Sequence, residues 1–509
     1  MGINRTKRSL INISVSIVSK ILVTLLPFAT RTIMIQTIGI EYLGVDSLFA
    51  SVLNMLSLSE LGFSSAIVYT MYKPVAEKED EKVKGLLCFY KTVYRVIGVI
   101  ILGVGLILLP NLQWFIAEGT TYPSDINIYI VYLILLVNAA ISYFLFSYKS
   151  AVLVATMRND IDSIIDTVRS IISHGLQIVA LLLFREYFLY IIILPIVTVA
   201  NNIFRAILID KKYPQYRGKG KLSKEDRKGI LTRVGALIGN KLGGVVFTSV
   251  DSIVISKYLG LVVLAKYTNY FTIFSAVFAI ETTVYSAIQS VVGNSLVSNS
   301  KENNFSLFKD IFNITIIISM VCVCCFTILY QPFITVWVGS GNLLGIEIPI
   351  LLALYYFIKS TRKPLFTFYE AAGLWRADFL KPYVSVIVNL VMNVAMVQII
   401  GLPGVIISSI FALAVIEMPW ESIVFFKHCF NVKAFEYGAL VLKSVLFCGI
   451  AFAITFFVGN FLPYGILGIV LRLMVTLAIC AVISLIMLKF TRGGRQAWGR
   501  FGLILKRKI

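Results

Sequence analysis

Two basic residues in the first apolar stretch are the side chains in this sequence most able to do chemistry. Lys20 and Arg31 lie eleven positions apart within residues 11–35. In an α-helix this spacing is three turns plus about 20°, so both side chains project from one face, about 16 Å apart along the axis. We predict a basic stripe that binds an anionic headgroup in a wet cavity. The alternative is that each side chain snorkels to its nearer interface.

A second charged pair, Lys241 and Asp251, lies in the apolar stretch 230–256. A charge at the bilayer centre costs about 2.5–3.5 kcal/mol on insertion scales, so each of these residues needs a compensating environment. An ion pair between Arg31 and Asp251 is geometrically possible. Such a pair would serve either as a gating contact or as a structural pair that neutralises itself.

Two acidic residues, Glu60 and Glu281, each lie near the middle of an apolar stretch. A carboxylate buried there can be protonated at rest, because burial disfavours its charged form. That property suits ion coupling or gating in a proton-coupled transporter. It suits equally well an inert hydrogen bond between helices, and the sequence does not separate the two uses.

Motifs for soluble chemistry are missing. The chain has no G-x-x-x-x-G-K-[ST] loop, no H-E-x-x-H sequence and no zinc-ligand spacing, and it holds only two His residues. Three of its seven Cys residues, Cys322, Cys324 and Cys325, lie inside an apolar run, and we interpret the Cys residues as small hydrophobic residues of a membrane protein. We therefore expect no enzyme, no cofactor and no metal site.

The composition points to a polytopic membrane protein. Of 509 residues, 58% are hydrophobic and 14% are charged, about half the charged fraction of an ordinary soluble domain. Since about 20 apolar residues cross a bilayer as a helix, the chain contains roughly fourteen spans. They run near 11–35, 43–72, 88–110, 127–149, 161–184, 187–209, 230–256, 263–295, 308–331, 346–368, 379–400, 404–427, 437–460 and 466–488. The first is too long for a signal peptide, so we expect it to be retained.

The connections between these stretches alternate in charge. Lys and Arg gather in the even-numbered connections and in the tail, whereas the odd-numbered ones have almost none, with Arg185 and Lys257 as exceptions. By the positive-inside rule, both termini are cytoplasmic. This pattern accounts for most of the net charge of +20, so nucleic acid is not an expected partner. The basic segment 211–229 reads as a cytoplasmic linker beside anionic lipid headgroups.

An internal repeat divides the chain. A shift of 221 residues sets Lys20 on Lys241, Gly39 on Gly260 and Glu60 on Glu281 without a gap. Six spans separate the copies, so both have the same orientation, as in parallel-repeat transporters. We predict an all-α protein with a six-helix N-lobe at 1–210, the linker at 211–229, a six-helix C-lobe at 230–436, and two further helices with a basic tail at 437–509.

Several short motifs resemble a known family. Arg31 followed by I-G-I-E-Y-L-G at 38–44 and E-L-G-F at 60–63 resembles the opening of Wzx-type polysaccharide flippases. Those proteins export O-antigen and capsule units and belong to the multidrug/oligosaccharidyl-lipid/polysaccharide exporter superfamily. The segment 251–260 with Tyr267, and Asn389 with G-L-P-G at 401–404, resemble the family's seventh helix and its eleventh-to-twelfth helix junction.

The resemblance implies a flippase that turns an undecaprenyl-pyrophosphate-linked oligosaccharide from the inner to the outer leaflet by alternating access, driven by an ion gradient. It assigns pyrophosphate binding to Arg31, Lys20 and Lys241. The location would be the plasma (inner) membrane of a bacterium, in lipopolysaccharide or capsule biosynthesis. Expected partners are the lipid-linked oligosaccharide, membrane lipids, H⁺ or Na⁺, and a polysaccharide polymerase with glycosyltransferases.

Two related functions remain as alternatives. A lipid II flippase would bind the same pyrophosphate-bearing carrier, so the sequence separates it poorly. A multidrug cation antiporter of the same fold would be expected to place an acid on its first helix. Here that helix has Lys20 and Arg31 and no acid, which argues against the antiporter.

Overall fold

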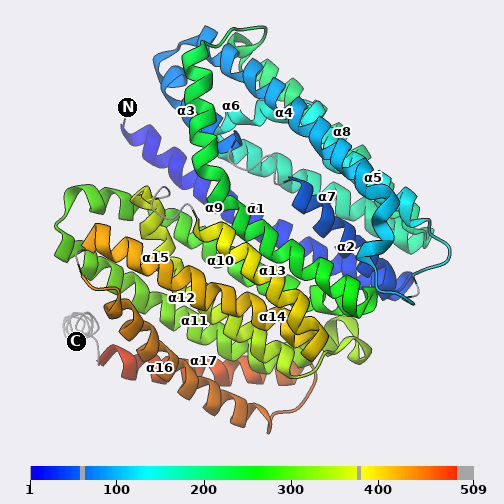
Figure 1. Cartoon of the computed structure of the whole chain (residues 1–509), viewed down its shortest axis with the longest axis vertical. Coiled ribbons are helices and arrows are strands. Elements are labelled where there is room, and N and C mark those ends of the chain that lie inside the picture. The colour runs from blue at the N-terminus through cyan, green and yellow to red at the C-terminus, as the bar shows by residue number, and fades with distance from the viewer. Residues whose placement is uncertain (1, 58–62, 121, 375–379, 431, 490–509) are drawn as a thin grey trace. The chain divides into compact units, whose positions relative to one another are not determined.

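The structure is a computed structural model, and it describes the chain except for residues 1, 58–62, 121, 375–379, 431 and 490–509. Within the described helices, the structure describes the backbone alone of residues 2–14, 16–17, 233, 235–246, 287 and 290. Every regular element in the described part is a helix, which confirms the all-α prediction (Figure 1). The helices group into two compact units, residues 1–268 and 269–509.

The described residues of unit 1 form nine α-helices, three short 3-10 helices and the start of a tenth α-helix. Helix α1 packs along α7, α2 lies against α9, and α5 lies between α4 and α8. The elements are α1 (Gly2–Thr37), α2 (Ile40–Leu56), α3 (Phe63–Glu77), α4 (Asp80–Leu108), η2 (Leu109–Phe115), α5 (Ile128–Phe144), η3 (Ser147–Lys149), α6 (Ser150–Ala155), α7 (Asn159–Leu183), α8 (Tyr187–Lys212), η4 (Pro214–Tyr216) and α9 (Lys224–Leu259).

Unit 2 begins within α10 (Leu261–Ser298) and is organised around α11, which contacts α12, α16 and α17. Two π-helical segments, η7 and η8, interrupt the helices that follow α14. The remaining elements are α11 (Lys301–Val338), η5 (Ser340–Asn342), α12 (Glu347–Ala371), α13 (Lys381–Ile400), α14 (Leu402–Phe411), η7 (Ala412–Glu417), α15 (Met418–Phe425), η8 (Phe426–Phe430), α16 (Phe435–Gly459) and α17 (Ile466–Lys489).

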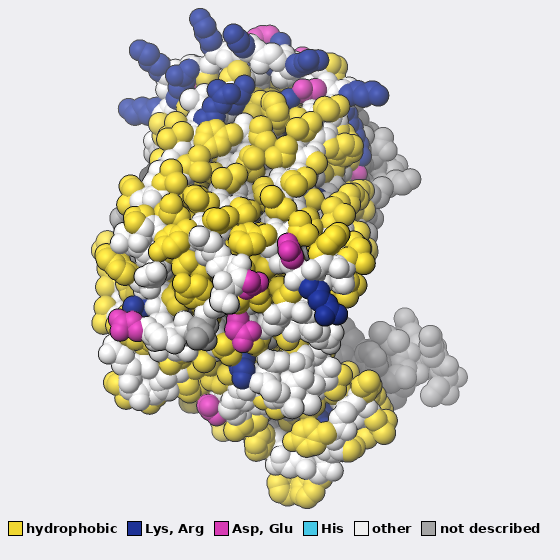
Figure 2. Space-filling view, turned by 90° about the vertical axis from the view of Figure 1, so that its right-hand side faces the viewer, with side chains coloured by type: hydrophobic (Ala, Val, Ile, Leu, Met, Phe, Trp, Pro, Cys, Tyr) yellow, Lys and Arg dark blue, Asp and Glu magenta, His cyan; other side chains and the backbone are white. Residues whose placement is uncertain are grey.

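The chain is a membrane protein by the length and composition of its helices. Ten described helices are long and apolar enough to cross a bilayer, and the bent pair Ile128–Phe144 and Ser147–Ala155 would make an eleventh. Each of the fourteen predicted stretches holds helix in the structure. The number fourteen itself stays a prediction, and so do the lobe boundaries drawn from the repeat. On the face drawn in Figure 2, hydrophobic side chains cover the flank of unit 1 below a group of Lys and Arg side chains.

Turn residues explain where several helices begin. Gly39 separates α1 from α2 at φ 117°, and Gly260 separates α9 from α10 at φ 88°. Both glycines adopt a left-handed backbone that other residues avoid, and they occupy equivalent positions of the repeat. Ser223 caps α9 by accepting a hydrogen bond from the Asp226 backbone N–H at 3.0 Å. Helix α9 therefore begins inside the segment that we predicted as linker.

The packing of α2 depends on a residue without a side chain. A Cβ atom added to Gly44 would lie 2.4 Å from the carbonyl oxygen of Leu261, so α2 and the start of α10 would have to separate. We expect Gly44→Ala to lower the free energy of unfolding by about 1–3 kcal/mol, as other overpacked sites do.

Thermal unfolding of the purified protein in detergent would measure this effect. Gly175→Ala on α7 is the matched control, because a Cβ there meets nothing within 4 Å and alanine is the better helix former. Equal unfolding midpoints for the two variants would contradict the close contact at Gly44.

Candidate functional site

Arg31, on α1 of unit 1, lies among polar groups from α2 and α10. Its side chain on α1 is half-buried, and Nη1 donates a hydrogen bond to Thr268 Oγ1 on α10 at 3.4 Å. Thr268 Oγ1 in turn lies 3.2 Å from Ser47 Oγ on α2. Asp46, also on α2, is the carboxylate that acts electrostatically on the guanidinium. The arrangement places one cation within electrostatic reach of one acid.

The preceding residue, Thr30, ties α1 to α7. Thr30 Oγ1 and His174 Nδ1 lie 2.8 Å apart, and Thr30 is almost completely buried. Such a bond holds α1 at a defined rotation, so that the next residue, Arg31, presents its guanidinium toward α2 and α10. His174 thus has a structural partner close to the Arg31 group.

The two other predicted basic residues are Lys20, whose side chain the structure describes, and Lys241, whose side chain it does not. Lys20 lies on the same continuous helix as Arg31, and its side chain is exposed. Lys241 is in helix α9, but its side chain is outside the described residues. Asp251 is buried on α9, at the position equivalent to Thr30. The predicted ion pair of Asp251 with Arg31 stays a prediction.

The two predicted acids also differ. Glu60 lies outside the described residues. Glu281 is buried on α10 and accepts hydrogen bonds from two groups on α12, Tyr356 Oη at 2.8 Å and Ser360 Oγ at 2.7 Å. Both bonds satisfy a carboxylate and join two helices of unit 2. Whether Glu281 also carries a proton during transport stays a prediction.

Two basic side chains on α12 lie near Glu281, and the sequence analysis did not single them out. Lys359 and Lys363 both act electrostatically on Glu281. Lys359 Nζ lies 4.7 Å from the centre of the Phe278 ring and Lys363 Nζ lies 5.9 Å from the same centre. Aromatic faces stabilise cations in places where water is scarce. The two lysines give unit 2 its own half-buried basic group.

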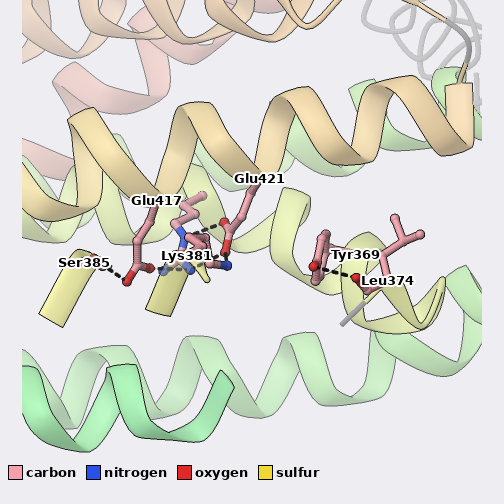
Figure 3. A network of polar contacts seen from close by, with 7 residues as sticks. Tyr369, Leu374, Lys381, Ser385, Glu417 and Glu421 are labelled. Atoms are coloured by element: carbon pink, nitrogen blue, oxygen red, sulfur yellow. Dashed lines mark hydrogen bonds and ion pairs between the residues drawn. The ribbon is translucent and has the colours of Figure 1, made fainter. Parts of the chain in front are cut away.

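A buried network of four charged residues lies next to this group. Arg362 on α12 binds Glu421 on α15 through Nε and Oε2 at 2.6 Å, and its Nη2 lies 2.6 Å from Glu417 Oε2. Lys381 on α13 forms an ion pair with Glu421, and Ser385 Oγ donates to Glu417 Oε1 at 2.9 Å. Figure 3 shows both glutamates pointing from one helix toward Lys381 and Ser385.

The charges of this network cancel. Arg362 and Lys381 are cations and Glu417 and Glu421 are anions, while the side chains of Glu421 and Lys381 are 0% and 3% exposed. Ionised groups this deeply buried persist only when they are paired and hydrogen-bonded. Three helices of unit 2 are therefore held in register by ionic contacts as well as by apolar packing.

A further, half-buried charge group lies between α7 and α8 in unit 1. Arg205 Nη2 lies 2.7 Å from Asp166 Oδ1 and 3.3 Å from Asp162 Oδ1. A polar cavity of about 380 Å³ adjoins Arg205 and is lined by groups from α4, α5, α7 and α8. The sequence analysis did not single out these residues, although charges spaced by four positions on α7 are a visible signal of one shared face.

Taken together, both units present cations in largely apolar surroundings, each with a nearby carboxylate. Half-buried Arg and Lys side chains of this kind can bind phosphate-bearing anions, and Arg can do so with two parallel hydrogen bonds. In the described residues, no group of three or more His, Cys, Asp or Glu side chains is placed to hold a metal ion.

Comparisons with known proteins agree with this fold. A family model described as "Polysaccharide biosynthesis protein" matches residues 9–293, more than half of the chain. Among solved structures, the lipid II flippase MurJ in an inward closed conformation is similar, with a TM-score of 0.67 and 14% identity over 93% of this chain and 98% of that one. No curated protein matches the sequence.

Multidrug transporters share the same fold. An inward-facing multidrug resistance MATE family transporter has a TM-score of 0.58 and 16% identity over 82% of this chain and 95% of its own. A MATE transporter from Vibrio cholerae has a TM-score of 0.53 and 12% identity over 86% of this chain and 98% of its own. At such low identities the likeness shows the fold alone.

Proposed function

The chain belongs to the polysaccharide biosynthesis protein family, and from this membership we propose that it is a flippase for a lipid-linked oligosaccharide. It is an integral membrane protein with the fold of flippases and transporters. The substrate would be an undecaprenyl-pyrophosphate-linked oligosaccharide, turned from the inner to the outer leaflet of a bacterial plasma membrane.

The observation that carries this proposal is the half-buried Arg31 on α1. A transporter of cationic drugs needs an acid where the cation binds, whereas α1 offers Arg31 and the exposed Lys20 and contains no Asp or Glu. The pyrophosphate of a lipid carrier is the anion that such groups suit. Lys241 is the third basic residue of the proposal, and Lys359 and Lys363 extend it to unit 2.

Alternating access coupled to an ion gradient is part of the proposal. The buried acids Asp251 and Glu281, together with Glu60, are its coupling or gating candidates. A carboxylate that exchanges its hydrogen-bond partners for a proton or a sodium ion can bias one conformation over another. In this scheme, the bonds from Tyr356 and Ser360 to Glu281 belong to one of the two states.

The orientation proposed from the sequence puts both termini in the cytoplasm. Basic residues of α3, α4 and the segment after α8 lie at one end of unit 1, where Lys and Arg side chains gather in Figure 2. The positive-inside rule assigns this end to the cytoplasm.

The experiment that tests the function is depletion of the protein in its host, followed by mass spectrometry of membrane lipids. We expect a polyprenyl-pyrophosphate oligosaccharide to accumulate while the matching surface polymer is lost. Accumulated lipid II with cell-wall failure would instead identify a lipid II flippase. Unchanged lipid intermediates together with new sensitivity to cationic drugs would refute the proposal in favour of an antiporter.

A further inference from the structure

A basic cavity lies at the end of unit 1 where the segment after α8 folds back over α4. The cavity has a volume of about 310 Å³ and is lined by residues of α4, η3, α6, α8 and η4 and by residues 217–219. We call it the linker pocket. It is separate from Arg31, which is not among its lining residues.

The linker pocket has an excess of positive charge. Lys91, Lys149, Arg217 and Lys219 line it together with one acid, Asp210, so the formal charges are +4 and −1, a net +3. Lys149 Nζ already pairs with Asp210 Oδ1 at 2.6 Å. In the part of the chain that the structure describes, no carboxylate forms an ion pair with the other three cations. Their charge is therefore available to an anion from outside the protein.

The wall of the pocket is held in place by backbone contacts. A Cβ atom added to Gly220 would lie 2.4 Å from the Gly85 backbone nitrogen, so the linker packs directly on the α4 backbone. The Gly220 N–H also donates to Cys88 Sγ at 3.5 Å. A cavity built in this way exists before a ligand arrives, which reduces the entropic cost of binding.

Tyrosines mark the pocket as an interfacial site. The rings of Tyr213 and Tyr216 stack with centroids 6.0 Å apart, and Tyr213 Oη accepts a hydrogen bond from Thr156 at 3.0 Å. Both tyrosines and the buried Tyr148 line the cavity. Tyrosine is enriched at the headgroup level of membranes, because its ring is apolar and its hydroxyl is polar.

Apolar stripes lead from the pocket along the helices that flank it. On α8, Ile203 and Ile207 lie on the same flank as Asp210 and are 42% and 63% exposed. On α4, Val99 is 61% exposed and lies two helical turns beyond Lys91 on a shared flank. A free phosphate ion would make no contact with these apolar surfaces, whereas the acyl chain of a lipid with its headgroup in the pocket would cover them.

We propose that the linker pocket binds the phosphate group of an anionic membrane lipid, with the acyl chains lying along α4 and α8. Basic pockets between membrane helices on the cytoplasmic side suit such headgroups, since each Lys or Arg near the surface adds to the attraction. This lipid site rests on the proposed orientation. It does not depend on which molecule the protein transports.

The test is thermal unfolding of the purified full-length protein in detergent, titrated with dioctanoyl phosphatidylglycerol. We expect the unfolding midpoint to rise and then saturate, while dioctanoyl phosphatidylcholine, which has the same chains but no net charge, gives little rise. In the double variant Lys91→Gln/Arg217→Gln, the lipid concentration at half-maximal shift should increase roughly tenfold or more.

Three further variants separate the effect of the charges from the effect of the pocket's shape. Lys211→Gln/Lys224→Gln removes the same charge from exposed positions near the pocket that do not line it, and it should respond like the wild type. Gly220→Ala keeps every charge but displaces the linker from α4, and it should weaken the lipid response. Gly229→Ala is its match, because a Cβ there meets nothing within 4 Å.

Three results would overturn the proposal. The first is an equal response of the pocket variant and the exposed-charge control, which would mean general attraction to anionic micelles. The second is a shift of the same size with inorganic phosphate or pyrophosphate alone, which would mean a site for a free anion. The third is a wild-type protein that phosphatidylglycerol does not stabilise. Should the double variant not purify, Arg217→Gln alone, at an exposed position, provides the same test.

Discussion

Replacing Arg31 by alanine should lower the rate of oligosaccharide flipping roughly ten- to a hundredfold, because a hydrogen bond to a charged group contributes about 1.5–3 kcal/mol. In the proposed mechanism the guanidinium binds the pyrophosphate, and few other cations of α1 can reach the binding position to replace it. Arg31→Lys should recover part of the rate, since it keeps the charge but loses the planar fork. Flipping of a labelled lipid-linked oligosaccharide in proteoliposomes of the purified variants measures the effect.

Two controls separate substrate binding from structure. Lys443→Ala removes a half-buried cation from α16, outside the Arg31 group, and should leave flipping unchanged. Arg31→Ala/Asp46→Asn removes the cation and the acid beside it together. If this double variant flipped at the wild-type rate, Arg31 would merely balance Asp46, and its assignment to pyrophosphate binding would be wrong.

Replacing Glu421 by glutamine should have the largest effect on stability. Glu421 is completely buried and pairs with both Arg362 and Lys381, so its neutralisation leaves two cations with Glu417 alone. Removing one partner from a buried ionic network typically costs about 3–5 kcal/mol, because a charge without compensation stays in an apolar interior. We expect a loss of folding free energy on the order of 3 kcal/mol, measured as a lower unfolding midpoint and less protein in the membrane.

A second substitution tests the cause. Lys381→Met in the Glu421→Gln background restores neutrality, with Arg362 facing Glu417, and should recover much of the lost stability. Glu436→Gln, an exposed acid at the start of α16, should change the midpoint little. A double variant that is less stable than Glu421→Gln alone would mean that Lys381 stabilises unit 2 by its packing and not by its charge.

Most of the fold was predictable because long apolar stretches have few alternatives to a helix in a membrane. The stretches predicted at 379–400 and 437–460 match α13 and α16 within a few residues, apart from residue 379 of the first, which lies outside the described part. The bend between α5 and η3 was not predicted. There, Phe146 adopts a left-handed backbone at φ 57°, a conformation that a phenylalanine rarely takes, and no glycine or proline signals it.

The candidate site was predictable only where a charge stood alone in an apolar stretch. Arg31 and Glu281 stood out in this way, and both take part in polar contacts. Lys359, Arg362 and Lys363 lie inside the predicted stretch 346–368, but they were counted with the positive charge of the connection that follows it. In the structure all three lie within α12. The charge of Arg362 is compensated there by Glu421, 59 positions away. A single sequence does not reveal pairs at such a separation.

The hydrogen bond between Ser47 and Thr268 joins two residues that the predicted repeat makes equivalent, since they are 221 positions apart. In a dimer of identical chains, a residue on the two-fold axis contacts the same residue of the other chain. Only a self-complementary side chain can make this contact without repulsion. A hydroxyl, which both donates and accepts, is such a group. Fusion of two copies into one gene removes the constraint from their neighbours. In the predicted repeat, Arg31 and Asp46 stand opposite Ser252 and Tyr267, so the second copy carries neither the cation nor the acid of the first.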